Sequence, residues 1–238
     1  MRKGGFSLIE CLLGMALSLL IIVSSLQFFG QAQKAFFRLK EREEAGQGAL
    51  AAIDKMRVDL LHAGRGLAGE MAHGLIEAVR STEDELRMTS LEKPLTLAGT
   101  AQAGDVRLLL ASTADIASGQ EICFSDGREG ELRSVERVEH GAVILGEPLE
   151  RDYSPDTAAL SLLENVAYFV DGPARILRRR VNAGSAQPLL ENIAAVMWIC
   201  DPEARLVRVR LELSVEGARP YETTVFLKNP ALAEKRGT

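Results

Sequence analysis

Residues 6–30, FSLIECLLGMALSLLIIVSSLQFFG, form an apolar run in which Glu10 is the only charged residue. At 1.5 Å per residue, a helix of this length extends about 37 Å, more than the ~30 Å hydrocarbon core of a bilayer. The run therefore predicts a membrane-spanning helix. Arg2 and Lys3 precede it. Because basic residues stay on the cytoplasmic side of a membrane, the rest of the chain is expected on the opposite side.

The carboxylate of Glu10 is at odds with a plain membrane anchor. Insertion scales put a carboxylate at the bilayer centre at about 2.5–3.5 kcal/mol unfavourable, so the group needs a partner. A cut between Gly5 and Phe6 would create an amine on Phe6, one helical turn from Glu10 and on the same face. The amine of a neighbouring subunit would serve equally well. The flexible pair Gly4–Gly5 suits an accessible cleavage site.

Conventional export signals fit this N-terminus less well. A signal peptide has a short apolar region that ends at a small-residue cleavage site, and no A-x-A pattern ends this run before residues 31–34. A lipoprotein signal would place the apolar region before its cysteine, whereas here the region follows Cys11, which is also next to Glu10. A signal anchor explains the length of the run and its basic leader, but it leaves Glu10 unexplained.

The stretch at residues 4–21, GGFSLIECLLGMALSLLI, resembles the class III signal of type IV pilins and type II secretion pseudopilins. This resemblance implies cleavage after Gly5 by prepilin peptidase, N-methylation of Phe6, and use of Glu10 for docking into a growing helical filament. One departure is that residues 6–30 contain no proline. Many major pilins have a proline in the middle of this helix.

A helical pattern continues past the apolar run to about residue 61, which predicts one helix about 80 Å long. Good helix formers dominate, and a stripe at three- and four-residue spacing can pack on a globular domain: Ala49, Ile53, Met56 and Leu60. Gly46 and Gly48 predict a bend or a frayed turn. Residues 64–69, GRGLAG, match G-x-G-x-x-G but close a helix, which favours a helix cap over a dinucleotide site.

From Asp105 onward the pattern is that of strands separated by turn residues, whereas the segment before it shows no clear pattern. The predicted strand regions are 105–112, 121–127, 132–138 and 142–149, followed by a hairpin at 164–180 with its turn at 171–173. Residues 205–215 alternate between apolar and polar side chains, which predicts a half-buried antiparallel strand paired with residues 221–230.

These patterns predict an α+β fold, with a long N-terminal helix packed on a C-terminal head of antiparallel sheet. The expected divisions are a cytoplasmic leader (1–5), a transmembrane and filament-core helix (6–30), the periplasmic half of the helix (31–62) and a β-rich periplasmic head (63–238). The head resembles PilW-type minor pilins and the J-type pseudopilins. Elements that carry this likeness are VDLLHAG (58–64), Tyr168, Leu177–Arg178, Pro188–Ile193 and Lys228–Asn229.

Composition and motifs give little support for catalysis or nucleic-acid binding. The net charge is −5 and only 5% of residues are aromatic, which disfavours a nucleic-acid surface. The sequence contains no G-x-S-x-G, H-E-x-x-H or Walker A motif. His140 is expected in a solvated turn, and Arg178–Arg180 are expected on an edge strand. Four carboxylates lack EF-hand spacing, so neither a metal nor a cofactor is expected: Asp152, Asp156, Asp201 and Glu203.

The three cysteines allow one candidate disulfide. Cys11 lies in the apolar run, where it is expected to be an ordinary helix residue. In an oxidising periplasm, Cys123 and Cys200 could form a bridge that closes a loop of about 78 residues and stabilises the fold by about 2–4 kcal/mol. The alternative is two separate buried thiols. There is no C-x-x-C pair, which argues against structural zinc.

The combined expectation is a non-enzymatic minor pilin that primes or caps a type IV pilus. Its expected partners are other minor and major pilins or pseudopilins, prepilin peptidase, the inner-membrane assembly platform and the lipid bilayer. The expected location is the bacterial inner membrane, with the head in the periplasm, and later the filament. Two alternatives stay open: a J-type pseudopilin of type II secretion, and a signal-anchored periplasmic binding module or enzyme.

Overall fold

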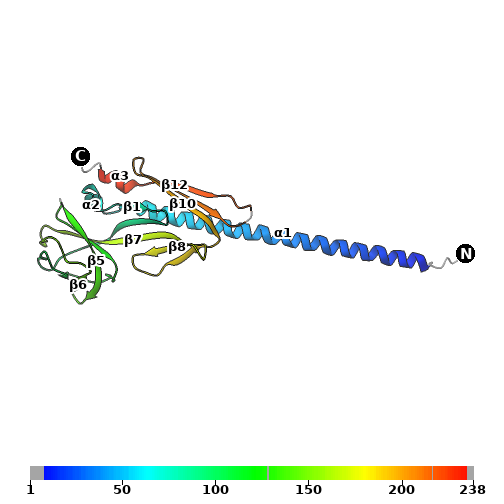
Figure 1. Ribbon diagram of the computed structural model, residues 1–238, viewed down its shortest axis with the longest axis horizontal. Coiled ribbons are helices and arrows are strands. Elements are labelled where there is room, and N and C mark those ends of the chain that lie inside the picture. Colours follow the sequence, from blue (N-terminus) through cyan, green and yellow to red (C-terminus); the bar gives the residue numbers. More distant parts are fainter. Residues whose placement is uncertain (1–7, 128, 216, 235–238) are drawn as a thin grey trace.

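The computed structural model describes residues 8–127, 129–215 and 217–234. The fold is α+β, with one long N-terminal helix followed by antiparallel β-sheets (Figure 1). Three helices are described: α1 (Leu8–His62), α2 (Ala68–Ala72) and α3 (Lys228–Glu234). The strands are β1 (Val79–Ser81), β2 (Glu85–Leu95), β3 (Arg107–Leu109), β4 (Glu121–Ser125), β5 (Gly130–Glu139), β6 (Ala142–Leu145), β7 (Ala159–Asp171), β8 (Ile176–Val181), β9 (Gln187–Leu190), β10 (Ile193–Asp201), β11 (Leu206–Leu213) and β12 (Tyr221–Phe226).

The predicted long helix is confirmed over Leu8–His62, a continuous α-helix of 55 residues. Its second half lies among the strands of the head, and its first half projects away from them (Figure 1). Burial on the helix begins at Gly46. The stretch before Gly46 is rich in charged helix formers, so the helix can continue through it without tertiary support.

The predicted bend at Gly46 and Gly48 is wrong, because α1 remains helical through both residues. They are instead places where the head approaches the helix closely. A Cβ on Gly46 would lie 2.7 Å from the hydroxyl of Tyr221, and a Cβ on Gly48 would lie 3.1 Å from a methyl group of Leu190. The missing side chains make room for β12 on one side and β9 on the other.

Strand β7 is the centre of the nine-stranded sheet, whose main path in the described residues is β1-β2-β7-β4-β5-β6-β3. It pairs with β2 along one edge; on the other edge it pairs first with β4 and then with β8. The predicted 164–180 hairpin is confirmed as β7 and β8, joined by a turn. Strands β1 and β2 lie in the segment for which the sequence showed no clear pattern.

A second sheet has the order β10-β11-β12 and is antiparallel throughout. The predicted alternation along β11 is confirmed, since Val207, Val209 and Leu211 are buried while Arg208 is exposed. The pairing of β11 with β12 is also confirmed. The buried face of this sheet belongs to the same apolar cluster as the buried stripe of α1.

The second half of α1 lies between the two sheets. Its main contacts are with β12 on the smaller sheet and with β9 and β2 on the larger one. The predicted stripe is confirmed as the core-facing side: Ala49, Ile53, Met56 and Leu60. A separate cluster fills the far end of the head, around β3 to β6. The helix is therefore held by the head over its second half only.

Candidate functional site

The first half of α1 presents large apolar side chains on all its sides, and nothing in the described residues covers them. Residues Leu8–His62 include a span long and apolar enough to cross a membrane by length and composition, with none of that span buried. A helix that is apolar all round is stable only inside a membrane or a protein assembly. The exposed side chains include Leu8, Ile9, Leu12, Leu13, Met15, Leu17, Leu19, Leu20, Ile21, Ile22, Val23, Leu26, Phe28 and Phe29.

Glu10 lies at the start of this surface, on a face where small residues follow at one-turn spacing. Gly14 and Ser18 continue the face, and a Cβ on Gly14 would meet nothing within 4 Å. The Ser18 hydroxyl donates a hydrogen bond to the Gly14 carbonyl at 2.8 Å, so it is satisfied within the helix. A shallow, open depression of about 510 Å³ runs along this face. Small residues of this kind let a second helix approach closely in an apolar environment.

The predicted processing residues, Gly5 and Phe6, lie outside the described residues. Of the predicted N-terminal set, only Glu10 lies within the described residues. Glu10 is exposed, as is the whole turn of the helix around it.

A buried polar cluster joins the second half of α1 to the larger sheet. Oδ2 of Asp59 accepts hydrogen bonds from the Tyr168 hydroxyl at 2.6 Å and from Arg179 Nε at 2.7 Å. Lys55 Nζ lies 3.3 Å from the other carboxylate oxygen. Burial by itself would raise the pKa of Asp59, but the hydrogen bonds from Arg179 and Tyr168 and the nearby cations outweigh it and hold the pKa below its usual value. The cluster keeps Asp59 ionised.

The expectation that Arg178–Arg180 lie on an edge strand is wrong, because β8 pairs with both β7 and β9. Each arginine instead has its own anionic partner. Arg178 pairs with Asp171 at 3.0 Å, Arg179 with Asp59 at 2.7 Å, and Arg180 with Glu85 at 3.3 Å. Sequence reasoning missed this role of Arg179 and Asp59. The sequence offered one signal of a buried polar contact: Asp59 is a carboxylate that falls at the spacing of the buried apolar stripe of α1.

The end of α1 is held by the C-terminal part of the chain. The side-chain amide of Asn229 donates hydrogen bonds to the carbonyl oxygens of Leu61 at 3.2 Å and Ala63 at 2.9 Å. Gly64 then has a φ of 71°, which turns the chain out of the helix as the predicted cap requires. Two of the elements that carry the pilin likeness in the sequence, residues 58–64 and Lys228–Asn229, thus contact each other.

The candidate bridge between Cys123 and Cys200 is not formed, and all three cysteines are free thiols. Cys123 lies on β4 in a small cluster beside α2, whereas Cys200 lies on β10 in the other sheet and packs against the α1 cluster. Burial raises the pKa of the Cys123 thiol to about 12. The alternative of two separate thiols is therefore the one that the structure bears out.

The other chemistry-bearing candidates are not gathered together. His140 lies exposed in the turn between β5 and β6, as predicted. Asp152 accepts a hydrogen bond from the Ala103 amide and Asp201 accepts one from the Ala204 amide, so both act within loops. No group of three potential metal ligands is found among the described residues.

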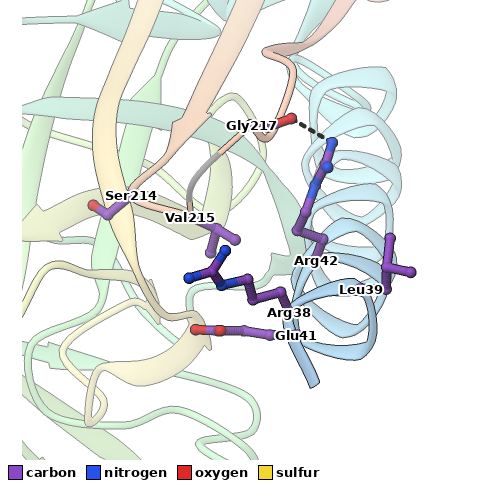
Figure 2. A pocket seen from close by; sticks show the side chains of 7 residues that line it. All are labelled: Arg38, Leu39, Glu41, Arg42, Ser214, Val215 and Gly217. Atoms are coloured by element: carbon purple, nitrogen blue, oxygen red, sulfur yellow. Dashed lines mark hydrogen bonds between the residues drawn. The ribbon is translucent and has the colours of Figure 1, made fainter. Parts of the chain in front are cut away.

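A groove opens where α1 leaves the head. It has a volume of about 450 Å³ and lies between the helix and the loop after β11 (Figure 2). Its lining residues are Arg38, Leu39, Glu41 and Arg42 on the helix and Ser214, Val215 and Gly217 on the loop. A guanidinium nitrogen of Arg42 donates a hydrogen bond to the carbonyl oxygen of Gly217 at 2.5 Å, and this bond crosses the groove. In Figure 2, Arg38 points toward Val215 while Leu39 points away from the loop.

No family model matches the chain, and no curated protein matches it. Two solved structures share a local likeness with it. The Gp54 tailspike of Acinetobacter baumannii bacteriophage AP22, in complex with A. baumannii capsular saccharide, is 14% identical over 32% of this chain and 15% of that chain, with a TM-score of 0.28. The tailspike protein gp49 from Pseudomonas phage LKA1 is 20% identical over 31% of this chain and 15% of that chain, with a TM-score of 0.26. At these TM-scores the two likenesses carry no argument about function.

Proposed function

We propose that this chain is a minor pilin-like subunit that co-assembles with related pilins to prime or cap a type IV pilus. The observation that carries the proposal is the first half of α1, an apolar helix with Glu10 at its start that the described part of the chain leaves uncovered. Such a helix must be stored in a membrane and can later pack among helices of the same kind. The proposal is that of a non-enzymatic assembly protein.

In the proposed sequence of events, the chain is inserted with its head in the periplasm and is cut between Gly5 and Phe6 by prepilin peptidase. The Phe6 amine is then N-methylated. The carboxylate of Glu10 pairs with the Phe6 amine of a neighbouring subunit as the helix leaves the bilayer. Coulomb attraction grows as the local dielectric constant falls, so this pair is strongest in the filament core and sets the axial position of each subunit.

Two features of the head support an assembly role. The described contacts between α1 and the head begin at Arg42, so the apolar half is free to pack with other subunits. The buried Asp59–Arg179 contact and the Asn229 contact at the end of α1 fix the helix on the head. A pull on the helix would therefore move the head with it, as a filament subunit requires.

The mature N-terminus provides the decisive test. Intact mass and N-terminal sequencing of the membrane-extracted protein should show a chain that begins at methylated Phe6. A chain that still begins at Met1 would overturn the proposal and favour a signal-anchored binding module or enzyme.

The same residues also fit a J-type pseudopilin of type II secretion, because the C-terminal elements that carry the likeness are common to both groups. Deletion of the gene separates the two functions. Loss of twitching motility or DNA uptake with normal protein secretion supports the pilus subunit, and loss of secretion alone supports the pseudopilin.

A further inference from the structure

Three large apolar side chains of α1 lie between the apolar half of the helix and the head. Phe36, Phe37 and Leu39 are 64%, 56% and 63% exposed, respectively. The head does not cover them, since the first hydrogen bond from α1 to the head that the structure shows is the one made by Arg42 to Gly217. Apolar surface of this size is unfavourable in water, so a covering environment is required.

Basic residues accompany these side chains on the side nearer the apolar half. Lys34 and Arg38 precede any acidic residue of this part of the helix, and the acids begin at Glu41. Lys40 is paired with Glu44 at 3.7 Å. The segment is therefore cationic toward the apolar half and acidic toward the head, and its cationic part is complementary to phosphate groups.

The apolar and basic side chains surround the helix instead of forming one stripe. Successive residues of a helix point about 100° apart, so Phe36 and Phe37 face different sides. Their rings meet edge to face, with centroids 6.1 Å apart. Leu39 and Arg38 also point in different directions (Figure 2). A single partner helix covers only one side, whereas a lipid headgroup layer surrounds the helix.

The position of the segment along α1 fits this layer. The uncharged stretch between Glu10 and Gln31 contains about 20 residues, so it spans about 30 Å, the thickness of a hydrocarbon core. Phe36 and Phe37 then lie about 8–10 Å beyond that core. Side chains of a helix lean toward its N-terminus, which is the membrane side here, so both rings reach back into the headgroup layer.

We propose that residues 34–39 of α1 form an interfacial belt that binds the phospholipid headgroup layer on the side of the head. This inference rests on the membrane insertion that belongs to the proposed function. Phe36, Phe37 and Leu39 lie on the outer side of the headgroup layer, with the two rings directed back into it. Lys34 and Arg38 bind the phosphates of anionic phospholipids. The bond from Arg42 to Gly217 then holds the loop after β11 above the membrane surface.

The depth of the belt can be measured on the full-length, uncleaved chain in nanodiscs, without any other subunit. A nitroxide is attached at Ala35→Cys, which leaves the belt side chains intact, in a chain that also carries Cys11→Ser and Cys200→Ser. The buried Cys123 stays in place. Collision rates with oxygen and with a water-soluble nickel chelate report the depth of the label. Ala51→Cys, at another exposed alanine of α1 on the half held by the head, is the matched control.

The belt predicts that the label at residue 35 collides several-fold less often with nickel than the label at residue 51, and more often with oxygen. Equal accessibility to nickel at both positions would overturn the proposal, because residue 35 would then lie in water as residue 51 does. The experiment uses the uncleaved chain, so its result does not depend on cleavage between Gly5 and Phe6. A mature chain that begins at Met1 would contradict the proposed pilus function but would not contradict the interfacial belt.

The role of the two cations has its own measurement. Nanodiscs of phosphatidylcholine alone are compared with nanodiscs that contain an equal share of phosphatidylglycerol. We expect the label at residue 35 to lie deeper in the anionic discs, and the double variant Lys34→Gln/Arg38→Gln to lose this difference. Arg57→Gln/Arg65→Gln, at two exposed arginines outside the belt, should keep it. No difference between the two lipid compositions in the unaltered chain would overturn the assignment of Lys34 and Arg38 to lipid phosphates.

Discussion

Asp59 of α1 and Arg179 of β8 form an ion pair of 2.7 Å, although they are 120 positions apart in the chain. Asp59 is only 8% exposed, and the interface around it is otherwise apolar. Apolar packing alone tolerates small rotations and shifts of a helix, whereas a buried carboxylate is satisfied in one arrangement only. We infer that this pair fixes the rotation of α1 about its axis, and with it the direction in which Glu10 faces.

Replacement of Asp59 by asparagine should destabilise the head strongly. Asp59→Asn leaves the Arg179 guanidinium next to a neutral group, and breaking a buried pair costs about 3–5 kcal/mol. We expect the lower end of this range, because Arg179 retains 18% exposure. Urea unfolding in detergent, followed by the fluorescence of Trp198 in the same cluster, measures the change. Lys55→Gln removes only the 44% exposed partner and should cost less than about 1 kcal/mol.

The same pair predicts a loss of stability in acid. The folded state holds the pKa of Asp59 below its unfolded value of 3.8, so the unfolded chain binds the proton more readily. The contribution of Asp59 to stability is therefore complete well above pH 3.8 and disappears as the pH falls through that value toward the lower folded pKa. The free energy of unfolding of the unaltered chain should fall more steeply below pH 4 than that of Asp59→Asn. Parallel curves for the two proteins would contradict this assignment.

A side chain at Gly46 should weaken the contact between α1 and β12. Gly46→Leu would push against the hydroxyl of Tyr221, which lies 2.7 Å from the position of a Cβ, and overpacking of this kind costs about 1–3 kcal/mol. Gly30→Leu is the matched control, because a Cβ there meets nothing within 4 Å. The combination of Gly46→Leu with Tyr221→Ala should recover part of the loss. Equal stability of the Gly46 and Gly30 variants would mean that β12 moves aside at no cost.

The long helix and strand β11 were predictable because each shows a strong periodic pattern over many residues. Strand β2 was not, although it pairs with β7 along most of its length. Its buried positions include Leu86 and Met88 but also Ser90, and Pro94 follows in the same strand, so the alternation is broken in the sequence. The central strand β7, which is longer and pairs with other strands along both of its edges, supplies the stability that β2 lacks on its own.

The features of the candidate site likewise fall into those that the sequence predicts and those that only the fold reveals. The Gly46 and Gly48 positions suggested a bend, because glycine weakens a helix in isolation, and only the packed head shows that the missing side chains make room for Tyr221 and Leu190. Asp59 could be seen as a charge within an apolar stripe, but its partner could not, since nothing local links it to Arg179. Contacts between distant segments can be seen only in the fold, whereas the proposed processing motif, residues 4–10, is a run of consecutive residues that the sequence alone displays.

The free state of the cysteines gives a chemical prediction. Cys123 is buried and its pKa is raised to about 12, so its thiol should resist alkylation at pH 8 until denaturant is added. The intact mass of the denatured chain should show all three thiols modified without prior reduction. Cys200→Ser should leave the midpoint of unfolding nearly unchanged, because no bridge is lost. A free energy of unfolding that is lower by about 2–4 kcal/mol in this variant would instead indicate a disulfide.

Removal of the charge at Glu10 should separate processing from assembly. Glu10→Gln keeps the shape of the side chain, and the proposed cut between Gly5 and Phe6 is four residues away in the sequence, so we expect cleavage and methylation to proceed. Incorporation should fail, because the Phe6 amine of the neighbouring subunit loses its counter-charge in a medium of low dielectric constant. Ser18→Ala, two turns further along the same face, removes only a hydroxyl that bonds within its own helix and should assemble normally. Immunoblots of sheared filaments and of membranes measure both steps, and normal incorporation of Glu10→Gln would remove the role that we assign to this carboxylate.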